Sequence, residues 1–311
     1  MKIIGTGSAF PSTIVTNQEL VKKLGEKYSA DWIEKNLGIR ERRKASEEET
    51  SLTFAQEAVN SAIKNSGVDK SSIDLLIMST STPELQAPAS ACQVQNGTKL
   101  MNAKAFDVSA VCSGFLYALT TAAAYLKANF SKRAIIVAAD TYSKITDWNS
   151  TDCAFFGDGA GAVVIENNIT SETFNYDSEL YTDGSCIDIF KIPFGGPFEL
   201  DATSAYEKVL STIPHCVDKL LHRNNMTTSD IDAVIPHQPS IRLLKALANK
   251  SSIPIEKFCL SMEKYGNTAS ATIPVTLHDA LEKGRISAGD NVLFLTAGGG
   301  FTAGAAIHKL C

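Results

Sequence analysis

The sequence has no uninterrupted apolar run of about 18 residues, the length at which a membrane-spanning helix becomes a candidate. Its start, MKIIGTGSAF, is too short in apolar residues to form the core of a signal peptide. A basic run is also missing: 29 Lys and Arg against 34 Asp and Glu leave a net charge of −5. We therefore expect a cytoplasmic protein with no membrane span and no nucleic-acid partner.

Neither a disulfide framework nor a set of paired metal-ligand cysteines is present. The chain has 7 cysteines, an odd number, and none of them forms a CxxC pair. The glycine-rich segments also lack the GxGxxG pattern that opens a helix in dinucleotide sites. We predict free thiols, no metal site and no cofactor, with at least one cysteine available as a nucleophile.

The 311 residues, 44% hydrophobic and 20% charged, can bury a sizeable core. Short apolar runs typical of strands buried on both faces alternate with longer stretches whose apolar residues recur at helical spacing. The predicted strands are 73–79, 105–109, 133–139 and 161–166, and the predicted helices are 51–65, 112–129 and 205–224. This alternation predicts an α/β fold with helices on both sides of the sheets.

The strand pattern recurs in the second half of the chain. Three pairs of segments match in the same order: VDKSSIDLLIMS with MTTSDIDAVIPH, RAIIVAAD with NVLFLTAG, and AGAVVI with AGAAIH. We interpret them as a duplicated half, although short apolar strings can also match by chance. Residues 167–203, rich in Gly, Asp, Ser and Pro, are predicted to be a variable connector. The predicted halves are residues 1–170 and 171–311.

Cys112 is the strongest candidate for a nucleophile. It follows the predicted strand AFDVS and opens a run of helix-forming residues, which predicts a thiol at a helix N-terminus. Unpaired N–H groups and the helix dipole stabilise a thiolate there and lower the pKa of the thiol. A buried, unreactive cysteine is the alternative.

His237 and Asn267 are further candidates. His237 ends the predicted strand DAVIP, where α/β sheets present side chains to a site, unlike the other four histidines. Asn267 follows Gly266, which permits an unusual turn, but an asparagine there could equally cap the next helix. The segment 297–301 (AGGGF) is more typical of a tight hairpin than of a site that offers N–H groups to an oxyanion.

Together these motifs resemble the β-ketoacyl-[acyl-carrier-protein] synthase III family of thiolase-fold condensing enzymes. The matching segments occur in the family's order over nearly the whole chain: IGTGSAFPSTIVTNQEL, DWIEKNLGIRERR, AFDVSAVCSGF, FGDGAGAVV, VIPHQ, YGNTASATIP and AGGGFTAGAA. The resemblance implies a five-layered αβαβα fold of two similar halves, and a homodimer.

The resemblance also implies roles for the candidate residues. Cys112 takes an acyl group from a thioester, while His237 and Asn267 hold the thioester oxygen of a malonyl-type extender during decarboxylation. The enolate then attacks acyl-Cys112, whose carbonyl oxygen is held by the N–H groups of Cys112 and Gly299. The product is a 3-oxoacyl thioester of fatty-acid initiation or of a secondary lipid or polyketide pathway. An acyl transfer without decarboxylation, or an acyl-acyl condensation, is the alternative.

Some positions depart from the family pattern. Trp32 is present, but Ser150 stands where the family often has an Arg that stacks coenzyme A adenine against that Trp. Ser240 replaces an asparagine whose amide meets the pantetheine arm. Trp148 could offer a substitute stacking face. We therefore expect acyl carrier protein and its acyl and malonyl thioesters as partners, in preference to coenzyme A.

Three residues are expected to line the acyl pocket. Ala87 stands where many relatives have a bulky residue directed at the partner's acyl pocket, and Ala297 stands where an aromatic is common. With Phe301, they are predicted to leave room for an acyl chain longer or more branched than acetyl.

Arg242 and Lys245 lie three apart on one face of the helix predicted after HQPS. Arg242 matches a family position that meets the acidic helix of acyl carrier protein, so we expect these residues to contact the carrier. A solvated helix face is the alternative.

Overall fold

The computed structural model describes residues 1–25, 28–167 and 175–311, which form two main sheets. The first has the order β1 (Lys2–Ala9), β7 (Gly159–Glu166), β6 (Arg133–Asp140), β4 (Leu75–Ser79) and β5 (Lys104–Asp107). The second has the order β11 (Ala233–Pro236), β12 (Asn291–Gly298), β13 (Thr302–Lys309) and β8 (Tyr176–Thr182). The predicted strands are confirmed to within a few residues.

The two sheets share one pairing pattern. In the first, β4 runs parallel to β6, and β6, β7 and β1 pair antiparallel in turn. In the second, β11 runs parallel to β12, and β12, β13 and β8 pair antiparallel in turn. Only β5 has no counterpart among the described strands, so the predicted duplication is confirmed. The predicted boundary between the halves lies outside the described residues.

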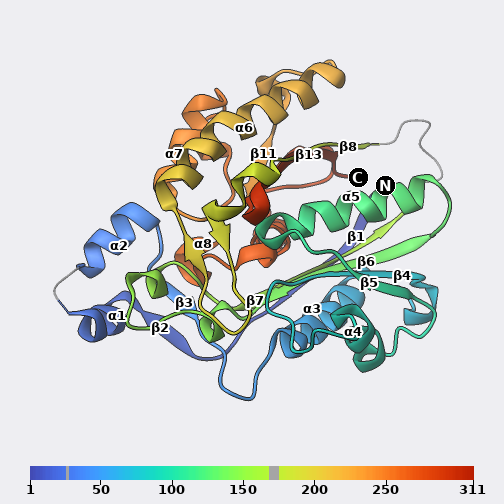
Figure 1. Ribbon diagram of the computed structural model, residues 1–311. Coiled ribbons are helices and arrows are strands. Elements are labelled where there is room, and N and C mark those ends of the chain that lie inside the picture. Colours follow the sequence, from blue (N-terminus) through green and yellow to red (C-terminus); the bar gives the residue numbers. More distant parts are fainter. Residues whose placement is uncertain (26–27, 168–174) are drawn as a thin grey trace.

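Helices and sheets alternate in five layers (Figure 1). The outer face of the first sheet carries α3 (Ser51–Ser66) and α4 (Ser90–Thr98). Helices α5 (Gly114–Lys127) and α9 (Thr272–Glu282) lie between the sheets. The outer face of the second sheet carries α6 (Ala202–Arg223) and α7 (Ile241–Lys250). The αβαβα architecture expected from the resemblance is therefore confirmed.

Strand alternation explains this layering. On β4, Leu75 and Ile77 pack into the core between the sheets, whereas Leu76 and Met78 pack against the outer helices. Both faces of the strand are thus apolar, which is why the sequence shows a continuous apolar run here.

The smaller elements lie beside the second half's helices. Strands β2 (Ile14–Thr16) and β3 (Glu41–Arg43) form a ribbon flanked by α1 (Asn17–Leu24), α2 (Ala30–Leu37) and α8 (Met262–Tyr265). Arg42 is fully buried in it, and its guanidinium donates to Asn17 Oδ1 at 2.8 Å and to the Ala154 carbonyl at 2.9 Å. Nowhere in the described ranges is a helix long and apolar enough to cross a membrane.

The prediction of a variable connector over residues 167–203 is wrong for much of that segment. It contains β8, the edge strand of the second sheet, and a small ribbon of β9 (Phe190–Lys191) and β10 (Glu199–Leu200). The sequence of β8, YDSELYT, lacks an apolar run because an edge strand is covered less completely than a central one.

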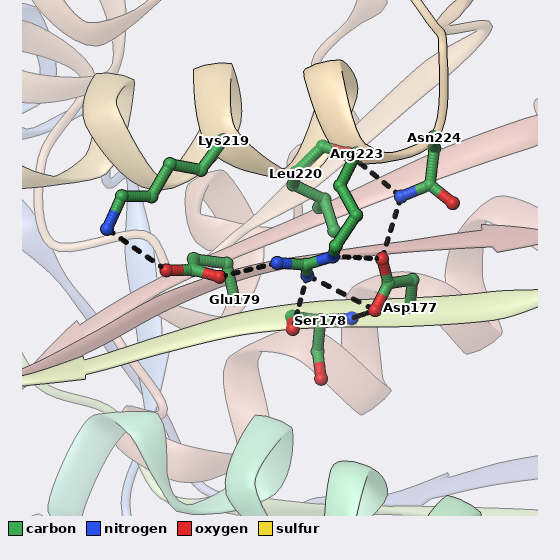
Figure 2. Close-up of polar contacts among 7 residues, drawn as sticks. All are labelled: Asp177, Ser178, Glu179, Lys219, Leu220, Arg223 and Asn224. Atoms are coloured by element: carbon green, nitrogen blue, oxygen red, sulfur yellow. Dashed lines mark hydrogen bonds and ion pairs between the residues drawn. The ribbon is translucent and has the colours of Figure 1, made fainter.

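Ion pairs attach β8 to the C-terminal end of α6 (Figure 2). Arg223 contacts Asp177 and Glu179 at 2.8 Å each, and Lys219 contacts Glu179 at 3.4 Å. The hydrogen bond from Arg223 lowers the pKa of Glu179. On the side of β8 that carries Asp177 and Glu179, polar contacts with the helix therefore replace apolar packing.

Candidate active site

One cavity of about 180 Å³ is lined by Cys112, His237 and Asn267 together. Cys112 comes from the turn after β5, His237 from the residue after β11, and Asn267 from the turn after α8. The first belongs to one half of the fold and the other two to its duplicate. The fold thus brings a thiol, an imidazole and a carboxamide to the lining of one cavity.

Cys112 lies in a short turn, Val111–Ser113, directly before α5. Val111 has φ +48°, a left-handed conformation that is rare for a β-branched residue. The second half holds the turn: Thr296 Oγ1 donates to the Cys112 carbonyl at 3.1 Å, and Ser113 Oγ donates to the Thr302 carbonyl at 3.1 Å. The thiol therefore has a fixed position at the start of a helix, where the sequence places it.

The expected lowering of the Cys112 pKa is not what the structure gives. Burial, followed by the charge of Asp140, raises the pKa of the Cys112 thiol to about 12. The cysteine packs in an aromatic cluster with Tyr142, Phe156 and Phe198, and the loss of solvation there outweighs the hydrogen bond at the helix start. The thiol is protonated when no substrate is bound.

His237 is buried and uncharged. Its backbone N–H donates to the Leu295 carbonyl at 2.7 Å, and burial lowers the pKa of the imidazole to about 4. Within the described part of the chain, Nδ1 is buried without a hydrogen-bond partner. The next residue, Gln238, accepts the Ser261 and Met262 N–H groups at 2.9 and 3.0 Å and so fixes this strand end against α8.

Asn267 caps a turn and also lines the cavity. Its Oδ1 accepts the Ala269 N–H at 2.9 Å, so the side chain does cap the following turn. Its backbone also bonds to Phe155 at 2.9 Å and to Gly157 at 3.0 Å. Because the oxygen is occupied, the Nδ2 group is the part of this amide left to donate to a ligand in the cavity.

Asp140 is a buried residue of this region that the sequence analysis did not select. Its carboxylate accepts the Ser81 N–H at 2.7 Å and, on its other oxygen, the Ser270 hydroxyl at 2.5 Å. Ser270 adjoins Ala269, which has φ +49° and whose N–H donates to Asn267 Oδ1. An acidic residue that ends an apolar strand, as in RAIIVAAD, is the pattern that could have drawn attention to it.

The glycine segment 297–301 forms the predicted hairpin and also lies against Cys112. Strands β12 and β13 pair up to Gly298 and Thr302, and Gly300 has φ +80°. A Cβ on Gly298 would lie 3.0 Å from the Cys112 nitrogen, so only glycine allows this approach. Gly299 also lines the cavity.

The other predicted site residues divide into two groups. Ala297, Phe301 and Ser240 line the cavity. The remaining predicted residues, all within the described ranges, are not part of this lining: Ala87, Trp32, Trp148, Arg242 and Lys245. Ala87 is exposed on a loop, and Arg242 and Lys245 are exposed on α7. Trp32 is 43% exposed beside Tyr28, and Lys44 lies over the Trp148 ring at 4.3 Å. Among the described residues, no cluster of His, Cys, Asp or Glu could hold a metal ion.

The comparison with known proteins decides the family. Residues 106–184 match the family 3-Oxoacyl-[acyl-carrier-protein (ACP)] synthase III, and residues 221–310 match its C-terminal family. A "Beta-ketoacyl-[acyl-carrier-protein] synthase III" of Erythrobacter litoralis is 38% identical and covers 99% of this chain and 98% of its own. The chain belongs to this family. It is therefore an acyl-condensing enzyme, as the motifs predict.

Solved structures show the same fold. The 3-oxoacyl-[acyl-carrier-protein] synthase III of Aquifex aeolicus has a TM-score of 0.93 and 35% identity, and the match covers 99% of each chain. The priming β-ketosynthase of the R1128 polyketide pathway has a TM-score of 0.92 and 26% identity over 99% of this chain and 96% of that one. One enzyme with this fold is thus a priming synthase of a polyketide pathway.

Proposed function

We propose that this 3-oxoacyl synthase carries an acyl group on Cys112 and condenses it, with loss of carbon dioxide, with a malonyl-type thioester. The observation that carries the proposal is the convergence of one thiol and two neutral side chains with N–H groups, His237 and Asn267, on one cavity. By the same family relationship, we propose that the enzyme acts in the cytoplasm.

In the first half-reaction, the Cys112 sulfur attacks the carbonyl carbon of an acyl thioester. The new C–S bond forms as the old one breaks, and the proton of Cys112 leaves with the departing thiol. The raised pKa of Cys112 means that this proton stays on the sulfur until the substrate arrives. We assign the oxyanion to the N–H groups of Cys112 and Gly299, and the close approach of the adjacent Gly298 to the Cys112 nitrogen supports this assignment.

In the second half-reaction, the malonyl thioester loses carbon dioxide and negative charge develops on the thioester oxygen. His237 and Asn267 donate hydrogen bonds to that oxygen. Because the pKa of His237 is lowered to about 4, the imidazole is neutral and stabilises the enolate without protonating it. The enolate carbon then attacks the acyl carbonyl, the C–S bond to Cys112 breaks, and the released thiolate takes a proton from water.

The surface beside the cavity supports an acyl carrier protein as the donor. Arg242 and Lys245 are exposed on α7, and the Arg242 guanidinium lies 5.8 Å from the ring centre of Tyr206, which lines the cavity. Ser240 caps α7 at this edge. A carrier with an acidic helix on Arg242 would deliver its pantetheine arm along Tyr206.

The carrier proposal is tested by charge reversal. Arg242→Glu is expected to raise the KM for acyl-carrier-protein substrates and to leave the KM for small free thioesters nearly unchanged. Added salt is expected to have the same effect on the wild-type enzyme. Lys64→Glu, which makes the same reversal of charge on the exposed side of α3, is the matched control. Equal losses on both substrate types would contradict carrier docking at α7, and so would no loss on either.

We also propose a homodimer formed at the open edge of the first sheet. Strand β5 ends that sheet and pairs only with β4 among the described strands. Ala87 lies on an exposed loop and would reach the partner's acyl pocket across such an interface. Sedimentation equilibrium tests this proposal, and a monomer at micromolar concentration would contradict it.

The proposed reaction is tested in two stages. Acyl thioesters on coenzyme A and on carrier protein are first scored by intact mass for acyl label on Cys112. Malonyl carrier protein is then added, and released carbon dioxide and the 3-oxoacyl product are measured. We expect one carbon dioxide for each product. Acyl transfer without carbon dioxide would contradict decarboxylation and favour the alternative transfer reactions.

A further inference from the structure

The cavity has a second wall that the proposed chemistry does not use. It consists of apolar side chains from α6, α7 and β12 that are almost fully buried: Ile213, Leu243, Leu247 and Leu295. Strand alternation puts Ala297 on the same face of β12 as Leu295, and Ala297 packs against the core cluster that contains Ile213, Leu247 and Leu295. We call the space bounded by these four side chains and Ala297 the acyl recess.

The acyl recess suits a hydrocarbon and does not suit a pantetheine arm. Its side chains carry no hydrogen-bonding groups, and an amide buried there without a partner would cost about 1–3 kcal/mol. Another part of the lining, at Ser240 and Tyr206, is half-buried and polar and adjoins Arg242. The amides of a pantetheine arm can form hydrogen bonds with these polar side chains. An apolar pocket, in contrast, stays dry and accepts apolar groups.

We propose that the alkyl part of the acyl group on Cys112 lies in the acyl recess, so that the enzyme takes linear acyl primers longer than acetyl. This inference rests on the proposed acylation of Cys112. The cavity connects the recess with the thiol inside a single chain, because both line it. Ala297 is then the residue that determines chain length, since its methyl group is the smallest side chain that borders the recess.

The inference predicts how the rate depends on chain length. Each methylene that enters the recess is expected to raise kcat/KM for acylation of Cys112 about fourfold, the equivalent of about 0.8 kcal/mol per buried methylene. The increase stops when the recess is full, and longer chains gain nothing further.

Ala297→Phe tests the inference by filling the recess. Acylation of Cys112 is followed by intact mass with acetyl and octanoyl thioesters of the same carrier, before any malonyl substrate is added. We expect the octanoyl to acetyl ratio of kcat/KM to fall at least roughly tenfold. Ala128→Phe, at an exposed alanine after α5, is the matched control and should leave the ratio unchanged.

A second variant covers the case in which Ala297→Phe does not fold. Val209→Phe acts from α6, where the half-buried Val209 lines the cavity next to the recess, and it should lower the same ratio. An unchanged ratio in a folded variant at either position would overturn the acyl recess. A wild-type enzyme that prefers acetyl to octanoyl would overturn it as well.

This test is separate from that of the condensation. Because only the first half-reaction is measured, a change in the ratio supports the recess even where no carbon dioxide is released. A Cys112 that no thioester acylates would overturn the recess and the proposed function together.

Discussion

The two walls of the cavity are built in different ways. On the catalytic wall, hydrogen bonds hold residues in place: Thr296 Oγ1 donates to the Cys112 carbonyl, and the Ala269 N–H donates to Asn267 Oδ1. On the wall of the acyl recess, side chains such as Ile213 and Leu247 make only apolar contacts. Hydrogen bonds specify direction and apolar contacts specify volume. The chemistry therefore depends on atoms held in place, whereas chain length depends on side-chain size.

The largest expected effect is at the thiol of the catalytic wall. Cys112→Ala should abolish acyl transfer, because no neighbouring side chain can replace a sulfur nucleophile at this turn. Intact mass after incubation with an acyl thioester is the measurement, with thermal unfolding as the control for folding. Turnover that persists in the purified variant would contradict the assignment.

Asp140 provides a test of position rather than contact. Asp140→Asn removes a carboxylate that accepts from Ser81 and Ser270, so decarboxylation should slow by roughly tenfold to a hundredfold. Because Asp140 contributes to the raised pKa of Cys112, the variant should also alkylate faster with iodoacetamide at neutral pH. Slower turnover without faster alkylation would show a loss of structure alone.

The pH dependence tests whether His237 acts as a neutral donor. With its pKa at about 4, decarboxylation by acylated enzyme should stay constant from pH 8 to about 5 and fall to half near pH 4. The unfolded imidazole, near 6.5, binds its proton first as the pH falls, so stability should also decrease from about pH 6.5 to 4. A decrease in the decarboxylation rate with its midpoint near pH 6.5 would contradict the buried, uncharged state of His237.

The smallest effect is expected far from both walls, at the other end of α6. Arg223→Ala breaks the pairs with Asp177 and Glu179 (Figure 2). Because Arg223 is 45% exposed, the loss of unfolding free energy should be about 1 kcal/mol or less. Urea denaturation measures it, and the octanoyl to acetyl ratio should not change. A changed ratio would mean that the ion pairs of Arg223 also affect the shape of the acyl recess.

The sequence predicted the strands and the place of Cys112 before a helix well, because both depend on local patterns. Strand β4 is a continuous apolar run, and Cys112 stands between a strand and helix-forming residues. His237 at a strand end was equally accessible. The polar edge strand β8 was missed because its pairing with β13 is decided by distant residues.

The remaining errors have the same origin in contacts between distant segments. The pKa of Cys112 is raised by burial among aromatic residues that include Phe198, which is remote in the sequence. The position of Asp140 is fixed by hydrogen bonds from Ser81 and Ser270, which lie far from it along the chain. The acyl recess likewise needs α6, α7 and β12 in place before its volume exists.

The measurement closest to the central claim separates the two half-reactions in one sample. His237→Ala and Asn267→Ala enzymes are acylated on Cys112, checked by intact mass, and then mixed with malonyl carrier protein carrying a labelled carboxyl group. We predict normal acylation and release of labelled carbon dioxide slowed by about 10²–10³-fold, since each donor acts on the enolate. Loss of acylation in both folded variants, or undiminished release of carbon dioxide, would contradict the account.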